Sequence, residues 1–99
     1  MKEEKKESKI PKFITDLGED KYQVICKHNT YVLEEKDGKT FETCKKLSEK
    51  LNISIEQLLV MRSLIEPKIS DDDFDSIKGS DYLKLHAAIA YIYGLDDFL

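Results

Sequence analysis

The feature that most constrains this chain is a short apolar segment with a defined start and end. Ser54 starts it as an N-cap, because its hydroxyl can accept a hydrogen bond from the amide of Gln57, which completes a capping box. Pro67 ends it, since its ring disfavours helical geometry at Glu66. The apolar side chains between these signals recur at helical spacing: Leu58, Leu59, Val60, Met61, Leu64 and Ile65. A helix that is apolar over most of its girth needs burial, so we expect the helix 54–66 at the centre of the core.

Three further helices are predicted from capping residues and apolar spacing. Residues 40–51 begin at Thr40 and place four apolar side chains on one face: Phe41, Cys44, Leu47 and Leu51. Residues 70–78 open with Ser70, which is followed by three aspartates whose charges complement the positive end of a helix. Residues 80–93 are closed by Gly94, a residue that readily adopts the left-handed conformation after a helix.

The N-terminal half contains the only predicted strands. β-branched and aromatic residues dominate about 21–35, which favours a small hairpin turning near His28 and Asn29. The Asp37-Gly38 step leaves an alternative open, because it could pair a strand at 31–35 with one at 40–43. With the helix preferred there, the sequence predicts a mainly α fold of about four helices with a small N-terminal β-hairpin.

The length and charge pattern predict one domain behind a tail. A chain of 99 residues fits a single domain. Residues 1–12 hold five lysines and three glutamates among few apolar groups, so we expect a flexible charged tail before a globular domain at 13–99. No apolar run is long enough to span a membrane, and the N-terminus lacks the apolar stretch of a secretory signal. These features predict a cytoplasmic protein.

The residue types that usually carry chemistry are not grouped in this sequence. Cys26, His28, Cys44 and His86 could in principle hold zinc, but only the first two are close together, at an unusual spacing. The aspartates from Asp71 onward lack the glycine and the final glutamate of a calcium loop. No nucleophile–base pair or glycine-rich phosphate loop is present. We therefore predict no catalytic residue, no metal, no cofactor and no enzymatic activity.

Residues 45–58 have the outline of a helix–turn–helix motif, which leaves a small DNA-binding regulator of phage or prophage origin as the alternative function. The second helix is nearly all apolar, however, and its one cation is Arg62. The net charge of −4 also opposes approach to phosphates, so no nucleic-acid partner is expected.

A resemblance appears in the C-terminal half. Residues 64–70 read Leu-Ile-Glu-Pro-Lys-Ile-Ser, residues 72–74 read Asp-Asp-Phe, and residues 80–85 read Ser-Asp-Tyr-Leu-Lys-Leu. This succession, which ends in Tyr93-Gly94-Leu95, resembles phage tail assembly chaperones from gene clusters of Gram-positive hosts. Gly38-Lys39-Thr40-Phe41-Glu42 is also similar, so the likeness covers roughly residues 38–95.

The resemblance implies a role in virion morphogenesis without catalysis. Such proteins are thought to bind the long helical tape-measure protein, keep it soluble, and leave before tail-tube proteins polymerise around it. The implied partners are therefore the tape-measure protein and, as a further candidate, the tail-tube protein, with no membrane partner.

A protein that holds an apolar partner needs uncovered apolar surface. The last helix carries two apolar faces, and a body this small cannot easily bury both. We expect the second face to form a groove or a homo-oligomer contact, although it could instead be additional core. Its candidate partner-binding residues are Leu83, Ala87, Ala90, Tyr91, Leu95 and Phe98.

Overall fold

A computed structural model describes residues 10–95 of the chain. Its centre is a four-stranded antiparallel sheet in the order β1-β2-β3-β4. The strands are β1 (Ile14–Gly18), β2 (Lys21–Ile25), β3 (Thr30–Glu34) and β4 (Leu64–Glu66). The other elements are α2 (Gly38–Leu51), α3 (Ile55–Ser63), the 3₁₀ helix η1 (Asp71–Ser76) and α4 (Gly79–Tyr93).

The predicted fold class is therefore wrong. Among the described residues 52% are helical and 21% lie in strands, so the chain has an α/β fold rather than a mainly α fold with a small hairpin. The predicted hairpin is present as the β2–β3 pair, whose turn is closed by a bond from the Cys26 amide to the Asn29 carbonyl at 2.9 Å. Two strands, β1 and β4, extend it on either side.

The missed strand β4 lies inside the predicted helix 54–66. Helix α3 ends at Ser63, and Leu64 has extended backbone angles. Leu64 pairs with Leu33, and Glu66 pairs with Val32, so this segment completes the sheet. Pairing with a strand about thirty residues earlier overrides the local helical spacing, which is a weak preference by comparison.

The missed strand β1 precedes the predicted hairpin. Its only buried residue is Ile14, and the next four residues are exposed. A strand at the edge of a sheet needs little apolar content of its own, because its neighbour supplies the pairing. Glu19 and Asp20, both with positive φ, make the tight turn to β2. The alternation that marks a half-buried strand is therefore missing from this part of the sequence.

The helical boundaries follow the predicted signals in part. Ser54 caps α3 by accepting from the Gln57 amide at 3.1 Å, and Gly94 ends α4 in the left-handed conformation, both as predicted. Asp37, not Thr40, caps α2, because its carboxylate accepts from the Thr40 amide at 2.9 Å. The predicted helix 70–78 is a 3₁₀ helix over Asp71–Ser76, and the predicted helix 80–93 is α4, which begins one residue earlier at Gly79.

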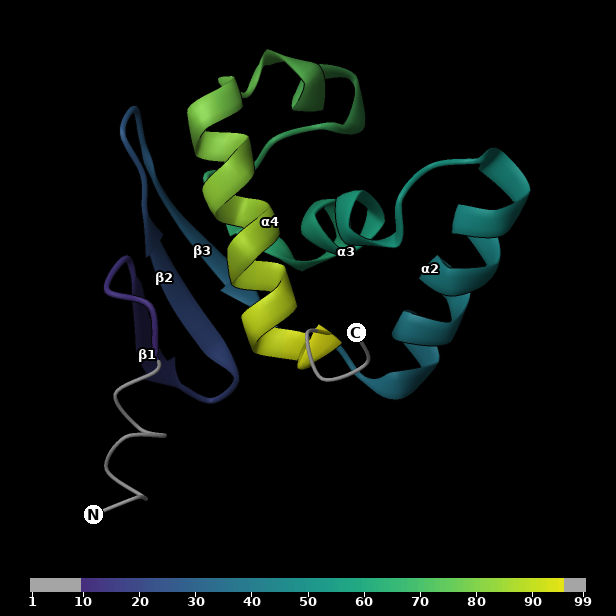
Figure 1. The fold of residues 1–99 in the computed structure, drawn as a ribbon, viewed down its shortest axis with the longest axis horizontal. Helices are drawn as coiled ribbons and strands as arrows, with labels where there is room; N and C mark the ends of the chain where they lie inside the picture. Colours follow the sequence, from purple (N-terminus) through teal and green to yellow (C-terminus); the bar gives the residue numbers. More distant parts are fainter. Residues whose placement is uncertain (1–9, 96–99) are drawn as a thin grey trace.

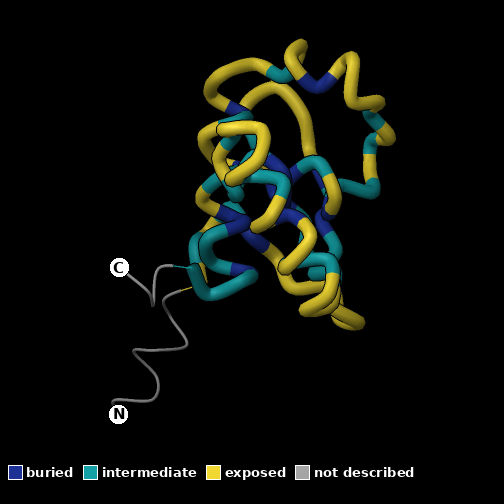
Figure 2. The backbone as a smooth tube through the Cα atoms, turned by 90° about the vertical axis from the view of Figure 1, so that its right-hand side faces the viewer, coloured by how far each residue is buried: buried dark blue, intermediate teal, exposed yellow. Residues whose placement is uncertain are grey.

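All three α-helices lie on one side of the sheet (Figure 1). Helix α4 packs against β2 and α3, and α3 also packs against β3. The main packing partner of α2 is α3. Figure 2 shows the buried residues gathered where these layers meet. The core therefore has the predicted centre, since Leu58, Leu59 and Val60 of α3 are buried there.

Helix α2 is the outermost element of this layer (Figure 1). Of its predicted apolar face only Cys44 is buried, while Phe41 and Leu47 are half-buried and Leu51 is 52% exposed. A helix that gives the core one side chain leaves part of its apolar face for another contact. The predicted tail at 1–12 lies outside the described residues except for its last three positions.

Candidate functional site

The predicted partner-binding residues occupy different environments on α4 and beyond it. Leu83 is 71% exposed and Ala87 is also exposed, while Ala90, Tyr91 and Leu95 are half-buried. Phe98 lies outside the described residues. Tyr91 packs edge-on against the ring of Tyr22 on β2, with 6.5 Å between ring centroids. The structure therefore divides the predicted stripe: one end is open, and the other end lies against the body.

One end of that stripe borders a hollow between α2 and α3. The hollow has a volume of about 360 Å³, and we call it the α2–α3 hollow. It is lined by Phe41, Lys45, Ser48, Glu49, Ile55 and Leu95. It forms because α2 turns away from the core: Asn52 adopts a left-handed conformation at its end, and the Ser48 hydroxyl donates to the carbonyl of Ile53.

A second hollow lies between η1, the start of α4 and the first turn of α3. Its volume is about 310 Å³, and we call it the Tyr82 hollow. It is lined by Gln57, Phe74, Asp75, Ile77, Gly79 and Tyr82. The rings of Phe74 and Tyr82 meet edge to face at 5.8 Å, and the Tyr82 hydroxyl forms a 2.8 Å hydrogen bond with Nε2 of His86. Burial raises the pKa of Tyr82, and the negative charges of Glu56 and Asp75 raise it further.

Tyr93, at the end of α4, ties three segments together on the far side of the α2–α3 hollow. Its hydroxyl accepts from the Lys36 amide at 2.9 Å and forms a 2.7 Å bond with the buried Ser63 hydroxyl. Its ring lies 6.2 Å from that of Phe41. These contacts join the end of α4 to the segment before α2, to α2 itself and to the end of α3.

Asp81, in the first turn of α4, turns its carboxylate into the protein rather than toward solvent. Asp81 is fully buried. One of its oxygens accepts from the His28 amide at 3.0 Å, and the other accepts from the Tyr31 hydroxyl at 2.9 Å. Burial and this hydrogen bond raise the pKa of Tyr31, which keeps the phenol neutral. The only signal in the sequence is an aspartate in a first turn, and that is equally typical of an exposed helix start.

The four residues considered as zinc ligands are not brought together. Cys26 lies beside α4, where its thiol donates to the Asp81 carbonyl at 3.8 Å, whereas Cys44 is buried on α2. His86 bonds to Tyr82 in its own helix, and His28 is exposed at the β2–β3 turn. Residues 10–95 contain no group of three or more metal-binding side chains placed to hold an ion.

Cys26 gives the protein a measurable response to alkaline pH. Burial raises the pKa of its thiol from about 9 to about 11, and the nearby Asp81 charge adds to this. Because the folded state holds the proton more tightly, its stabilising effect is complete below pH 9 and is lost as the pH rises toward 11. Urea unfolding should therefore show a falling free energy of unfolding over this range, with a smaller fall for Cys26→Ala. An equally steep fall in Cys26→Ala between about pH 9 and 10 would exclude the thiol as its cause.

The helices of the chain and its comparison with known proteins were also considered for function. Within the described part of the chain, no helix has both the length and the apolar character needed to cross a membrane. No protein-family model, no curated protein and no solved structure matches the chain.

Proposed function

We propose that this protein is a non-catalytic phage tail assembly chaperone that binds a helical segment of the tape-measure protein. The observation that carries the proposal is the α2–α3 hollow, a mostly apolar depression beside a helix whose one fully buried residue is Cys44. All six of its lining residues fall within residues 38–95, the part of the chain that resembles such chaperones.

The lining of the hollow offers apolar contacts of the kind that an amphipathic helix uses. Amphipathic helices bind by placing apolar side chains, spaced three and four residues apart, into a groove between helices. Phe41 and Ile55 offer apolar walls from two different helices, and Leu95 closes one end. Farther along α4, the exposed Leu83 and Ala87 provide apolar surface for a longer partner.

The state of the thiols argues against a cysteine nucleophile. A cysteine nucleophile needs a lowered pKa, because the thiolate is the reactive form. The pKa of Cys26 is raised to about 11, and burial also raises the pKa of Cys44. Both side chains therefore stay protonated near neutral pH.

The burial of α3 favours protein binding over operator binding. In a helix–turn–helix protein the second helix presents its side chains to base edges in the major groove. Here the corresponding helix turns Leu58, Leu59 and Val60 into the core. A regulator would shift labelled operator DNA at moderate salt, and we expect no such shift.

The proposal is tested by co-expressing the chain with the tape-measure protein of the same gene cluster and measuring how much of that protein stays soluble and bound. Leu95→Glu places a charge in the hollow and should lower the bound fraction at least roughly tenfold, because the charge must be desolvated. Leu17→Glu is the matched control, since Leu17 is 50% exposed on β1. Equal binding by a folded Leu95→Glu variant, checked by circular dichroism, would contradict the proposal.

A further inference from the structure

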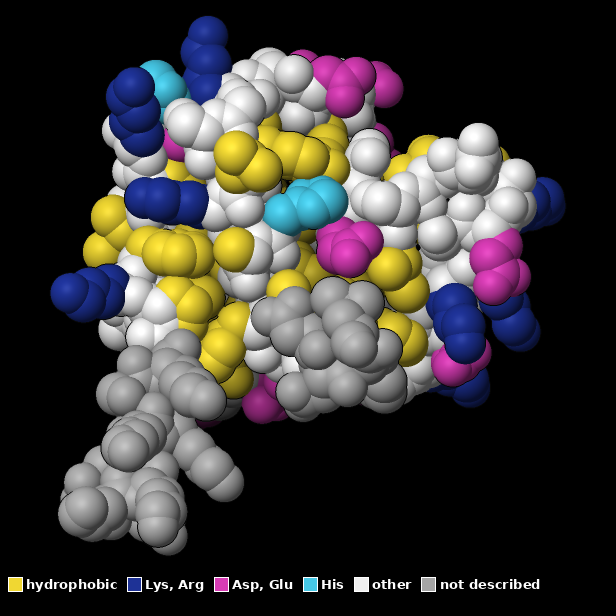
Figure 3. Space-filling model, in the orientation of Figure 1, with side chains coloured by type: hydrophobic (Ala, Val, Ile, Leu, Met, Phe, Trp, Pro, Cys, Tyr) yellow, Lys and Arg dark blue, Asp and Glu magenta, His cyan; other side chains and the backbone are white. Residues whose placement is uncertain are grey.

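The two hollows lie on either side of the first turn of α3. Ile55 lines the α2–α3 hollow, and Gln57 lines the Tyr82 hollow. Glu56, which lies between them in sequence, is half-buried and close enough to Tyr82 for its charge to act on the phenol. Figure 3 shows the corresponding face, where an acidic side chain and a histidine lie among hydrophobic side chains between α4 and α2. One partner segment that crosses this turn would contact both hollows.

The charges around these hollows are mostly negative. Asp75 and Glu49 line them, Glu56 lies between them, and Glu42 is exposed on α2 one turn before Lys45. Lys45 is the one cation among the lining residues, and it lies three and four residues from those two α2 glutamates, which offset its charge.

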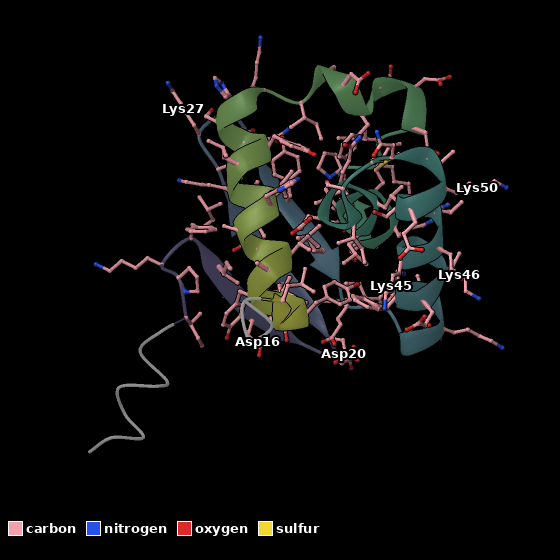
Figure 4. The ribbon with its side chains drawn as sticks, turned by 45° about the vertical axis from the view of Figure 1, so that its right-hand side comes forward. Asp16, Asp20, Lys27, Lys45, Lys46 and Lys50 are labelled. Carbon is pink, nitrogen blue, oxygen red and sulfur yellow. The ribbon has the colours of Figure 1, made fainter. Side chains whose placement is uncertain are left out.

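Lys46, Lys50 and Lys78 lie outside the linings of both hollows. Figure 4 shows Lys46 and Lys50 on the outer side of α2, away from the sheet. Lys78 precedes the first turn of α4 and is exposed, without lining the Tyr82 hollow. The positive end of α4 at Gly79 is offset by Asp81 within the same turn.

The walls of the Tyr82 hollow add a second attraction for a cation. Tyr82 lines the hollow with a half-buried aromatic ring, and the face of such a ring attracts an ammonium or guanidinium group. Asp75 at the rim can pair with the same group, and the Gln57 amide can accept a hydrogen bond from it. A carboxylate in the same place would meet Asp75 and Glu56 instead.

We propose that the bound segment is a basic amphipathic helix: its apolar side chains fill the α2–α3 hollow, and one of its Lys or Arg side chains enters the Tyr82 hollow. This inference rests on the proposed function and specifies the chemistry of the partner. According to this inference, the face binds a helix with basic side chains more tightly than it binds an apolar helix without them.

The test uses labelled synthetic helices of about 18 residues with one leucine stripe, flanked either by lysines or by glutamates. Fluorescence anisotropy measures their affinity for the full chain at low and at high salt. The lysine peptide should bind at least roughly tenfold more tightly, and the difference should shrink as salt screens the charges. Equal affinity of the two peptides would overturn the inference.

Charge variants then separate the hollow from the net charge of the protein. Asp75→Asn and Glu56→Gln should each weaken the lysine peptide about fivefold to tenfold. Asp72→Asn is the matched control, because Asp72 is an exposed residue of the same 3₁₀ helix and lines neither hollow. A loss with Asp72→Asn as large as that with Asp75→Asn would show general attraction and overturn the inference.

Binding of the two peptides to the Leu95→Glu variant separates failure of the basic-partner inference from failure of the proposed function. If Leu95→Glu abolishes binding of both peptides while their affinities are equal, the hollow binds helices but the basic partner is wrong. If Leu95→Glu leaves both peptides bound as before, the hollow is not the binding site, and the proposed function fails with the inference.

Discussion

Replacing Leu59 with alanine is expected to lower the free energy of unfolding by about 3–4 kcal/mol. Leu59 is fully buried on α3, the helix that contacts α2, α4 and β3. Truncating a leucine in such a site removes its transfer free energy and leaves a cavity that the three neighbouring elements cannot all close. Urea denaturation followed by circular dichroism measures the change.

The matched control for this substitution is Leu83→Ala. Leu83 is 71% exposed on α4, so its truncation should change the free energy of unfolding by less than about 0.5 kcal/mol. If Leu59→Ala cost no more than Leu83→Ala, α3 would not be the centre of the core, and the arrangement of both hollows around its first turn would be wrong.

Replacing Asp81 with alanine is expected to cost about 2–4 kcal/mol, although Asp81 is a charged residue near a helix start. The substitution removes the acceptor for the His28 amide and for the hydroxyl of Tyr31, which is itself buried. A buried donor without an acceptor costs its full desolvation free energy. The loss should also release the β2–β3 turn from α4, which amide hydrogen exchange at His28 can follow.

Asp72→Ala is the control for this prediction, since Asp72 is exposed and should change stability little. Tyr31→Phe should cost less than Asp81→Ala, because it removes one donor while the His28 amide keeps its acceptor. A stable Asp81→Ala variant would show that the carboxylate is not the link between the hairpin and α4.

The local ends of the helices could be predicted because they depend on neighbouring residues. Ser54, Ser70 and Gly94 each make the backbone contact that their residue type favours at a helix end. The central place of Leu58 and Leu59 could also be predicted, since a helix that is apolar all round has no other stable position.

The sheet could not be predicted in full because its outer strands depend on distant partners. The segment Leu64–Glu66 has helical apolar spacing and becomes a strand only because β3 lies beside it. Burial of Asp81 follows from the same sheet, since Tyr31 and the His28 amide reach it from the β2–β3 hairpin. Without the sheet in place, that aspartate is indistinguishable from its exposed neighbours.

Of the residues that line the α2–α3 hollow, only Leu95 was predicted from the sequence to bind a partner. The sequence indicated surplus apolar surface on the last helix, and Leu95 does border the α2–α3 hollow. The other walls come from α2 and α3, and for Phe41 the sequence predicted only a place on the apolar face of its helix. The contacts of Tyr93 with Lys36 and Ser63, which join α4 to the segment before α2 and to α3, are also not revealed by helical periodicity.

The most direct test of the account is an amide chemical-shift map of the ¹⁵N-labelled chain during titration with the helical segment of the tape-measure protein that it binds. The account predicts that the shifts concentrate on the two hollows, at residues such as Phe41, Lys45, Ile55, Gln57 and Tyr82, and leave β1 and β2 unchanged. Shifts concentrated on the strands, or none at saturating partner, would contradict it.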